Sequence, residues 1–311
     1  MYRFSPLFLI VCLVCFATAA WAQRDPRSVE GYVTAGFQAG IANYFGDIYA
    51  DFSMTRPAVG VFISRKLSPH WHARLSLSWA RLIGDDSKAP ANTLVYARNL
   101  SFRNDVKELT VTGIYEFGSS FGRYGRRRTF APYVFGGLAL IHHNPQAGIE
   151  GGRWVDLQPL GTEGQGRPGY RSLYSKIQAA VPLGVGLRIR VSDRMDVGVE
   201  TGLRLLLFQY IDDVGGRYAR PDDLNSPLAA RLANRTLDPI AVSSGQTRDL
   251  TSTLAALGTT TYTGVNGVNY DSLNGFQPGS KRGNSNLDSY LITTFHVSYI
   301  IDVGLKCPRF R

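Results

Sequence analysis

The chain has 311 residues, a formal net charge of +10 at pH 7, and 33 glycines, 16 tyrosines and 16 phenylalanines. Beyond residue 22 it has a single cysteine, Cys307, which excludes an internal disulfide from that part. No later segment approaches 18 uninterrupted apolar residues, which argues against a transmembrane helix. This composition, with a mean hydropathy near zero, is typical of strands that have two unlike faces.

The first 22 residues predict a secretory signal peptide. Arg3 gives a positive start, Leu7 to Ala20 form an apolar core, and Ala20-Trp21-Ala22 places small residues where a signal peptidase reads, so cleavage is expected before Gln23. The apolar core is shorter than the roughly 20 residues that a helical anchor needs. Residues 23–311 are then expected to form one domain. Because an exported chain rarely meets nucleic acid, the basic charge indicates anionic lipid headgroups or an acidic protein partner.

Eight stretches of the remaining chain alternate between apolar and polar or small side chains. They are centred on residues 31–43, 59–63, 71–79, 108–117, 131–141, 176–191, 195–207 and 290–301. The clearest is Lys176 to Val191, whose odd positions are all apolar and whose even positions are polar or small. A period of two indicates an extended strand with one apolar face. Soluble strands usually stop near five or six residues, whereas a strand that crosses a membrane needs roughly 9–11.

The tryptophans of the third stretch support a membrane. Trp71 and Trp79 share the apolar face, eight residues apart, or roughly 26 Å along a strand. A tilt of about 40° reduces this to roughly 20 Å of height, close to the spacing of interfacial aromatic girdles. We therefore predict an all-β fold, an antiparallel up-and-down transmembrane β-barrel of about eight strands in the outer membrane.

The connections alternate in length. Those after the second, fourth and sixth strands are shorter, and the others are longer: a polar loop at 84–104, a loop at 142–174 and the longest at 211–287. Outer-membrane barrels have short periplasmic turns and long external loops, so both termini are expected in the periplasm. Within the longest loop, Pro227 to Ala233 predict a short helix with Ser226 as its cap.

Two strands leave questions open. The stretch from Ala131 to Ile141 is apolar on both faces, so its outward side cannot be chosen from the sequence. Pro182 lies in mid-strand and removes a hydrogen-bond donor, which predicts a local bulge.

Charged residues fall on the predicted inward faces. They are Arg74, Glu108, Glu116, Arg188, Arg190, Glu200 and Arg204. Because isolated buried charges are costly, these residues are expected to pair across the lumen. An eight-stranded barrel has an interior just wide enough for side chains. We therefore expect a plugged barrel with no substrate channel, no small-molecule substrate and no cofactor.

The outer rim is where a catalytic site would be expected. Barrel proteases and lipid-modifying barrels place acids and histidines there, and the candidates are Asp85, Asp86, Asp212 and His143. Loop aspartates and interfacial histidines explain these residues without catalysis, and no nucleophile motif accompanies them, so a non-enzymatic protein is expected. His142 and His143 face opposite ways on a strand and predict no metal site. Gly161 to Gly166 follow no strand-to-helix pattern and predict no phosphate loop.

Two segments carry candidate contact residues. The loop 142–166 combines turn formers with large apolar residues, which indicates either a packed cap or a contact surface. The turn that ends in Arg126-Arg127-Arg128 is either a solvated charge run or a periplasmic contact or headgroup anchor.

Several motifs resemble one family. They are Gly46-Asp47, Arg98 to Arg103, Pro132 to Gly137, Asn144-Pro145, Trp154 to Gly166 and Tyr210 to Tyr218. Together they resemble the small outer-membrane barrel family of Bacteroidota that includes PorG, a component of the type IX secretion and gliding machinery. The block from Trp154 to Gly166 is the most specific part. Its motif residues are Trp154, Asp156, Gln158, Pro159, Gly161, Glu163, Gly164 and Gly166.

The resemblance implies a structural role: an outer-membrane barrel that anchors the periplasmic PorK–PorN ring complex. The family brings no catalytic residues and includes paralogues of unassigned role. The ring contact is expected at Arg123, Arg126, Arg127 and Arg128. Two alternatives stay open, namely a surface adhesin or receptor that uses loop 211–287, and a rim hydrolase that acts on lipid or peptide.

Overall fold

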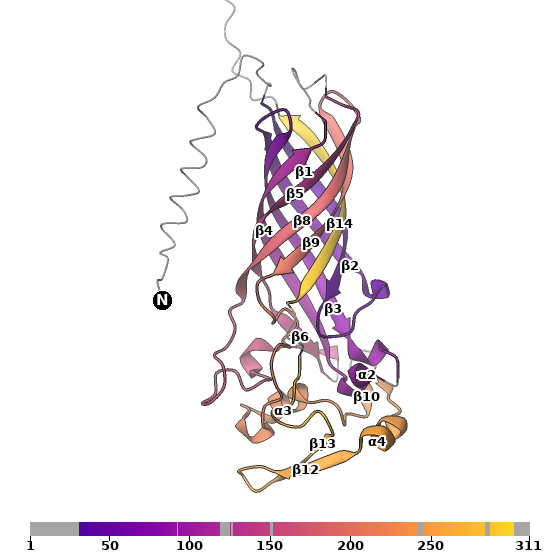
Figure 1. Ribbon diagram of the computed structural model, residues 1–311, viewed down its shortest axis with the longest axis vertical. Coiled ribbons are helices and arrows are strands. Elements are labelled where there is room, and N and C mark those ends of the chain that lie inside the picture. Colours follow the sequence, from indigo (N-terminus) through magenta and orange to yellow (C-terminus); the bar gives the residue numbers. More distant parts are fainter. Residues whose placement is uncertain are drawn as a thin grey trace, which may run out of the picture.

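The computed structural model describes residues 31–91, 93–118, 125, 127–149, 152–241, 245–283 and 287–301. Eight long antiparallel strands close into a barrel in the order β3-β2-β1-β14-β9-β8-β5-β4, and β4 pairs back to β3 (Figure 1). The strands are β1 (Val33–Phe45), β2 (Arg56–Lys66), β3 (Trp71–Asp85), β4 (Ser101–Glu116), β5 (Phe130–His142), β8 (Ile177–Arg190), β9 (Met195–Leu206) and β14 (Ser289–Ile301). The predicted fold class is confirmed. Among the helices of these ranges, none has the length and apolar character needed to cross a membrane.

The alternation along the strands separates an apolar outer surface from the lumen. In β4, Leu109 and Val111 are exposed on the outside, while Glu108 and Thr110 between them are buried. A continuous belt of exposed apolar side chains is stable where lipid tails, not water, surround it. In β5, where the sequence left the outward side open, Leu138 is 61% exposed and lies outside, because the bulky ring of Tyr133 and its inward neighbours fill the lumen.

Strands β3 and β4 extend further than predicted. The expected polar loop at 84–104 is shorter, because Asp85 pairs with Ser101 and the ladder between the two strands is continuous from there. Beyond the apolar belt the outward positions become charged, as at Arg81 and its partner Asp105. The backbone hydrogen bonds between two strands do not depend on the polarity of the side chains. Composition alone therefore could not show that these polar segments continue the strands and do not form a loop.

The bulge predicted at Pro182 is wrong. Pairing between β5 and β8 is interrupted opposite Pro182, but Gly136 pairs with Leu183 and Ala139 pairs with Ala180 in one unchanged register. The missing N–H is therefore accommodated by a gap in the ladder without an extra residue. Pro182 keeps its partner Arg204 in β9 on the other side.

The two ends of the barrel differ (Figure 1). Short turns join the strands at the end where Val33 pairs with Ile301, and the long connections gather at the other end, as predicted for a periplasmic and an external side. The external connections hold α2 (Leu94–Arg98), β6 (Pro145–Gly148), β7 (Trp154–Asp156), β10 (Ile240–Ala241), β11 (Gln246–Thr247), α3 (Pro227–Ala233), α4 (Thr251–Leu257), β12 (Thr259–Thr263) and β13 (Asn269–Leu273). The predicted helix at Pro227–Ala233 is confirmed, with the Ser226 hydroxyl accepting the Ala229 N–H at 3.1 Å.

Candidate functional site: a filled barrel under an outer cap

Paired charges fill the lumen from its periplasmic end past its middle, where Arg204 and Tyr290 both contact Glu108. The ion pairs are Arg74–Glu200 at 2.6 Å, Arg188–Glu116 at 2.7 Å, Arg204–Glu108 at 3.3 Å and Arg127–Asp196 at 2.7 Å. The pairing predicted for the inward charges is thereby confirmed for Arg74, Arg188, Arg204 and their three glutamates. Arg190, also predicted to pair, donates to the Gly125 carbonyl at 2.6 Å. Each arginine that meets a carboxylate here lowers the cost of burying both charges.

The packing leaves little space between these groups. Gly186 of β8 faces inward, and a Cβ placed on it would lie 2.3 Å from the ring of Tyr133, so only glycine makes room for this ring. The cavity among His72, Glu116 and Arg188 measures about 30 Å³, which is room for only two or three water molecules at about 10–15 Å³ each. The lumen in the described part of the chain is therefore a packed core at this level.

Beyond these pairs an apolar cluster fills the external end of the lumen. Tyr44, Phe102 and Tyr290 are buried there in one cluster, with Tyr44 and Phe102 edge to face at 4.8 Å. The longest loop sends Ile211 and Val214 into the same cluster. Ile211 and Val214 thus form an apolar stopper that closes the barrel at its external end.

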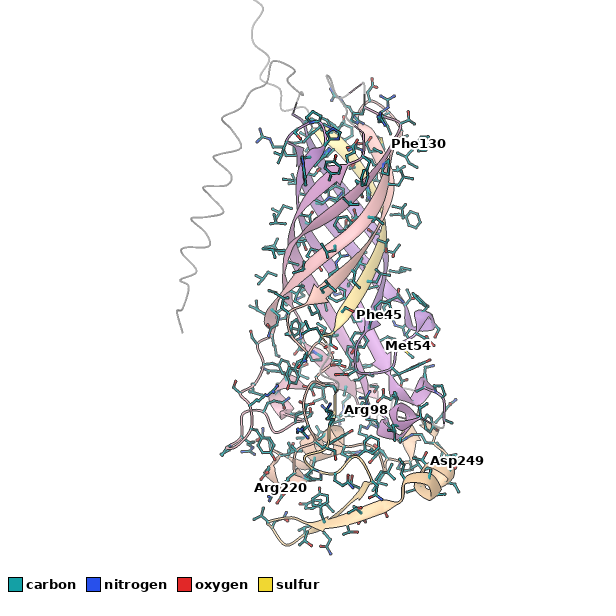
Figure 2. The ribbon with its side chains drawn as sticks, in the orientation of Figure 1. Phe45, Met54, Arg98, Phe130, Arg220 and Asp249 are labelled. Carbon is teal, nitrogen blue, oxygen red and sulfur yellow. The ribbon has the colours of Figure 1, made fainter. Side chains whose placement is uncertain are left out.

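The external connections pack together into a cap over the end of the barrel. Two buried arginines hold this cap together. Arg98 of α2, labelled within the cap in Figure 2, forms an ion pair with Asp86 at 2.7 Å and donates to the Asp47 carbonyl. Arg282 lies 3.3 Å from Glu163 and donates to the Asp213 carbonyl at 2.8 Å. Arg98 also donates to the Arg282 carbonyl at 3.0 Å, so the two arginines together join all four external connections.

The motif residues of the third loop are divided between the interior and the surface of the cap. Glu163 accepts the N–H groups of Gly215 and Gly216, both at 3.1 Å, and Gln158 donates to the Tyr174 carbonyl at 3.0 Å. Asp156 accepts from Gln146 at 2.7 Å, Pro159 is exposed on a short 3-10 turn, and Trp154 lies beneath a strand arginine. Gly161, Gly164 and Gly166 have φ values of +59°, +80° and +81°, which favour glycine. A packed cap accounts for Gly161, Glu163 and Gly164, which are buried, while Trp154, Pro159 and Gly166 are exposed on its surface.

Three aspartates meet where the cap enters the barrel. One carboxylate oxygen each of Asp47, Asp212 and Asp288 lies within 4.8 Å of the others, an oxygen-rich set of the type that Ca²⁺ prefers. Burial raises the pKa of Asp212 to about 7, and burial together with Asp212 and Asp47 raises the pKa of Asp288 to about 10. Asp212 accepts the Tyr44 hydroxyl at 2.6 Å and the Val214 N–H at 3.0 Å. The raised pKa of Asp288 means that this carboxyl keeps its proton at neutral pH, which reduces the repulsion among the three side chains.

The residues considered for a rim hydrolase have structural partners. Asp86 accepts from Arg98, the Leu100 N–H and the Tyr49 N–H, and Asp85 caps a short turn by accepting the Ser87 N–H at 3.0 Å. Asp212 belongs to the aspartate cluster. His143 is buried, its Nε2 atom lies 3.1 Å from the Ser175 carbonyl, and its ring stacks with that of Tyr174. Burial lowers the pKa of His143 to about 4, so its ring is neutral at neutral pH.

The four arginines proposed for a ring contact differ in placement. Arg123 and Arg126 lie outside the described residues. Arg127 is only 3% exposed and donates to Asp196 and to the Asp193 carbonyl at 2.7 Å each. Its side chain therefore fills the periplasmic end of the lumen and is not exposed for contact with a partner protein. Arg128 is exposed beside it.

Sequence reasoning missed the roles of Arg98 and Arg282. In a polar loop the sequence has no periodicity, so it does not distinguish an arginine that is buried and ion-paired from one that is solvated. Arg98 does open one of the family-like runs, which is the only hint that the sequence offers.

Comparison with known families decides the class of protein. The family model described as outer membrane protein beta-barrel domain matches residues 8–218, more than half of the chain. The chain belongs to this family. It is an outer-membrane β-barrel, and the closed antiparallel sheet with its apolar outer face agrees with this assignment.

Solved barrels show distant similarity to this family member. The N-terminal barrel domain of Pseudomonas aeruginosa OprF is 10% identical, with 88% of this chain and 100% of that chain covered and a TM-score of 0.33. A major outer membrane protein of Thermus thermophilus is 10% identical, with 88% and 100% covered and a TM-score of 0.38. Neisserial surface protein A is 9% identical, with 86% and 96% covered and a TM-score of 0.34. A comparison with curated proteins finds no match.

Proposed function

We propose that this barrel is a non-enzymatic anchor in the outer membrane, and that it holds a periplasmic ring complex of the type IX secretion machinery. The observation that carries the anchoring role is the filled lumen, in which charged pairs and an apolar stopper occupy the described interior. A barrel without an aqueous path acts through its surfaces. The assignment to type IX secretion rests on the resemblance of Trp154 to Gly166 and the other motifs to the PorG-type family.

Purification of the full chain from solubilised outer membrane of its own host tests this function. We expect PorK-like and PorN-like proteins to co-purify with it. The variant Arg123→Gln/Arg126→Gln/Arg128→Gln should lose them, while sparing the structural residue Arg127. A matched triple on the external cap, Arg171→Gln/Arg217→Gln/Lys281→Gln, should keep them. If the periplasmic triple variant still co-purifies with the ring proteins, the proposed contact at these arginines is wrong. If the ring proteins are absent from the wild-type preparation, the proposed role in secretion is wrong.

A surface receptor is the second candidate, and one observation favours it. The hairpin of β12 and β13 lies at the far end of the cap (Figure 1), with Val265 and Val268 at its tip 78% and 50% exposed. Thr260 pairs with Ser272 across the hairpin, so residues 261–271 can be replaced by a short turn that keeps the buried residues Ser272 and Leu273. Lost cell attachment with intact protein export would favour the receptor. Lost export with intact attachment would favour the secretion role.

A further inference from the structure

A recess of about 890 Å³ opens on the flank of the barrel at its external end. Its floor is formed by outward residues of β3 and β4, among them Arg81, Ile83 and Arg103, and loop segments that include Met54 and Trp154 overhang it. Figure 2 shows Met54 beside the barrel rim, outside the lumen. This volume falls in the range of about 300–1,000 Å³ that small-molecule and cofactor sites occupy.

The recess is strongly basic. Its lining includes one acidic side chain, Asp85, and six basic ones, Arg56, Arg81, Lys88, Arg103, Arg153 and Arg231. Arg81 is ion-paired with Asp105 at 2.6 Å, and Arg231 lies 3.5 Å from Asp238. The surplus of positive charge therefore remains after both neighbouring carboxylates are counted.

Arg103 is held in place for a ligand. Its guanidinium lies 4.0 Å from the centre of the Trp154 ring, and its Nη2 atom donates to Gln146 at 2.8 Å. Its buried Nε atom has no hydrogen-bond partner. Stacking on the indole and the amide bond fix the plane of the guanidinium, so little freedom is lost when an anion binds.

The height of the recess matches the lipid headgroups. Trp79 is the outward residue of β3 at the external edge of the apolar belt, opposite Lys107 of β4. The Arg81 guanidinium lies 5.5 Å from the Trp79 ring, and the recess begins there. Since interfacial aromatic girdles mark the boundary between lipid tails and headgroups, the recess faces the headgroups of the outer leaflet.

The outward face of β3 is apolar between the recess and the middle of the strand. Leu75 and Leu77 are 50% and 57% exposed there. Leu77 and Arg81 lie on the same face of β3, four residues apart, or roughly 13 Å. A lipid whose headgroup fills the recess could thus lay an acyl chain on this surface.

We propose that the recess binds the phosphorylated headgroup of an anionic glycolipid of the outer leaflet. Arginine guanidinium groups form charge-assisted, bidentate hydrogen bonds with phosphate, and the Trp154 ring with Ile83 and Ile149 offers an apolar surface to a sugar ring. This inference does not depend on the proposed role in secretion. It adds a lipid ligand to the outer side of a barrel whose protein partner is proposed on the periplasmic side.

The test uses the full chain reconstituted in phosphatidylcholine vesicles, with lipid A in its phosphorylated and its dephosphorylated form as probes. Wild-type protein should bind phosphorylated lipid A and discriminate against the dephosphorylated form. The variant Arg56→Gln/Lys88→Gln/Arg153→Gln should weaken this binding about tenfold or more, because three charged donors are lost. The cap triple Arg171→Gln/Arg217→Gln/Lys281→Gln, which removes the same charge elsewhere, should change it less than about twofold.

Each other result overturns the proposal. Equal losses in the two triples would show unspecific attraction to a basic surface, and equal binding of both lipids would show that the phosphate is not recognised. Complete displacement of the lipid by inorganic phosphate would identify a free anion as the ligand. Retained difference in gel mobility between unheated and boiled samples verifies that each variant has folded.

Discussion

The Nη1 atom of Arg282 lies 3.3 Å from Oε1 of Glu163, although 119 residues separate them. Both side chains are almost completely buried. Arg282 also donates to the Ala233 carbonyl at the end of α3, at 3.1 Å, and Glu163 accepts two backbone N–H groups. One ion pair therefore joins the third external loop to the fourth and makes the cap a single packed unit.

Loss of this pair should loosen the cap without opening the barrel. We expect Arg282→Gln to destabilise the cap by about 3–5 kcal/mol, because it leaves Glu163 as an uncompensated buried charge. Trypsin should then cleave within residues 211–287 on intact cells much faster than in the wild type. Arg217→Gln, at an exposed arginine of the same loop, is the control and should resist as the wild type does. Unchanged cleavage of Arg282→Gln would contradict the role of the pair.

The lumen pair Arg74–Glu200 allows a test of the filled interior. Arg74→Met alone should destabilise the barrel by about 3–5 kcal/mol, since Glu200 would remain buried without its partner. The double variant Arg74→Met/Glu200→Met should lose much less, because both charges are gone and the volume is kept. Urea unfolding in detergent micelles measures both. If the double variant is as unstable as the single one, the loss of stability does not come from an unpaired buried charge.

The aspartate cluster predicts a pH dependence of the cap. The folded pKa of Asp288 is raised to about 10, above its unfolded value of about 3.9. Its burial therefore costs nothing at pH below both values and costs progressively more as pH rises toward the folded pKa. Asp212, with a pKa raised to about 7, adds to this loss only up to about that pH. From pH 8 to 9 the cap should therefore lose stability through Asp288, on the order of 1 kcal/mol per pH unit.

Limited proteolysis across this pH range measures the effect. His143, with a pKa lowered to about 4, destabilises only below its unfolded value of about 6.5, so it does not contribute within the window. Asp288→Asn should abolish the slope, while Asp271→Asn, at an exposed aspartate of β13, should keep it. A slope that survives Asp288→Asn would assign the pH dependence to another group.

The outer face of the barrel predicts a large penalty for charge. Phe295, near the middle of β14, is 72% exposed, and in a bilayer this exposure is contact with lipid tails. Phe295→Arg should destabilise the barrel by about 2–4 kcal/mol. Leu287→Arg, at a residue 57% exposed in the external loop, should have little effect. Folding assays into lipid vesicles measure both, and equal stability of the two variants would contradict a membrane position for β14.

The positions of the strands could be predicted from the sequence because the alternation of apolar and polar side chains is a local pattern. Each residue's neighbours at i±2 share its environment, so apolar positions such as those of β8 identify a lipid-facing strand without any knowledge of its partners. The helix at Pro227–Ala233 was predictable for the same reason, since its cap and its first proline are adjacent in sequence. The signal peptide predicted at residues 1–22 lies outside the described residues.

The sequence by itself determined that this chain forms a barrel with an apolar outside and a charged inside. The tertiary structure alone decided which carboxylate each lumen arginine meets, that Arg127 turns inward, which side of β5 faces lipid and how Arg98 and Arg282 build the cap. The physical reason is distance along the chain. A period of two is set by successive residues, whereas ion pairs such as Arg74–Glu200, 126 residues apart, exist only once the sheet has closed and fixed its register.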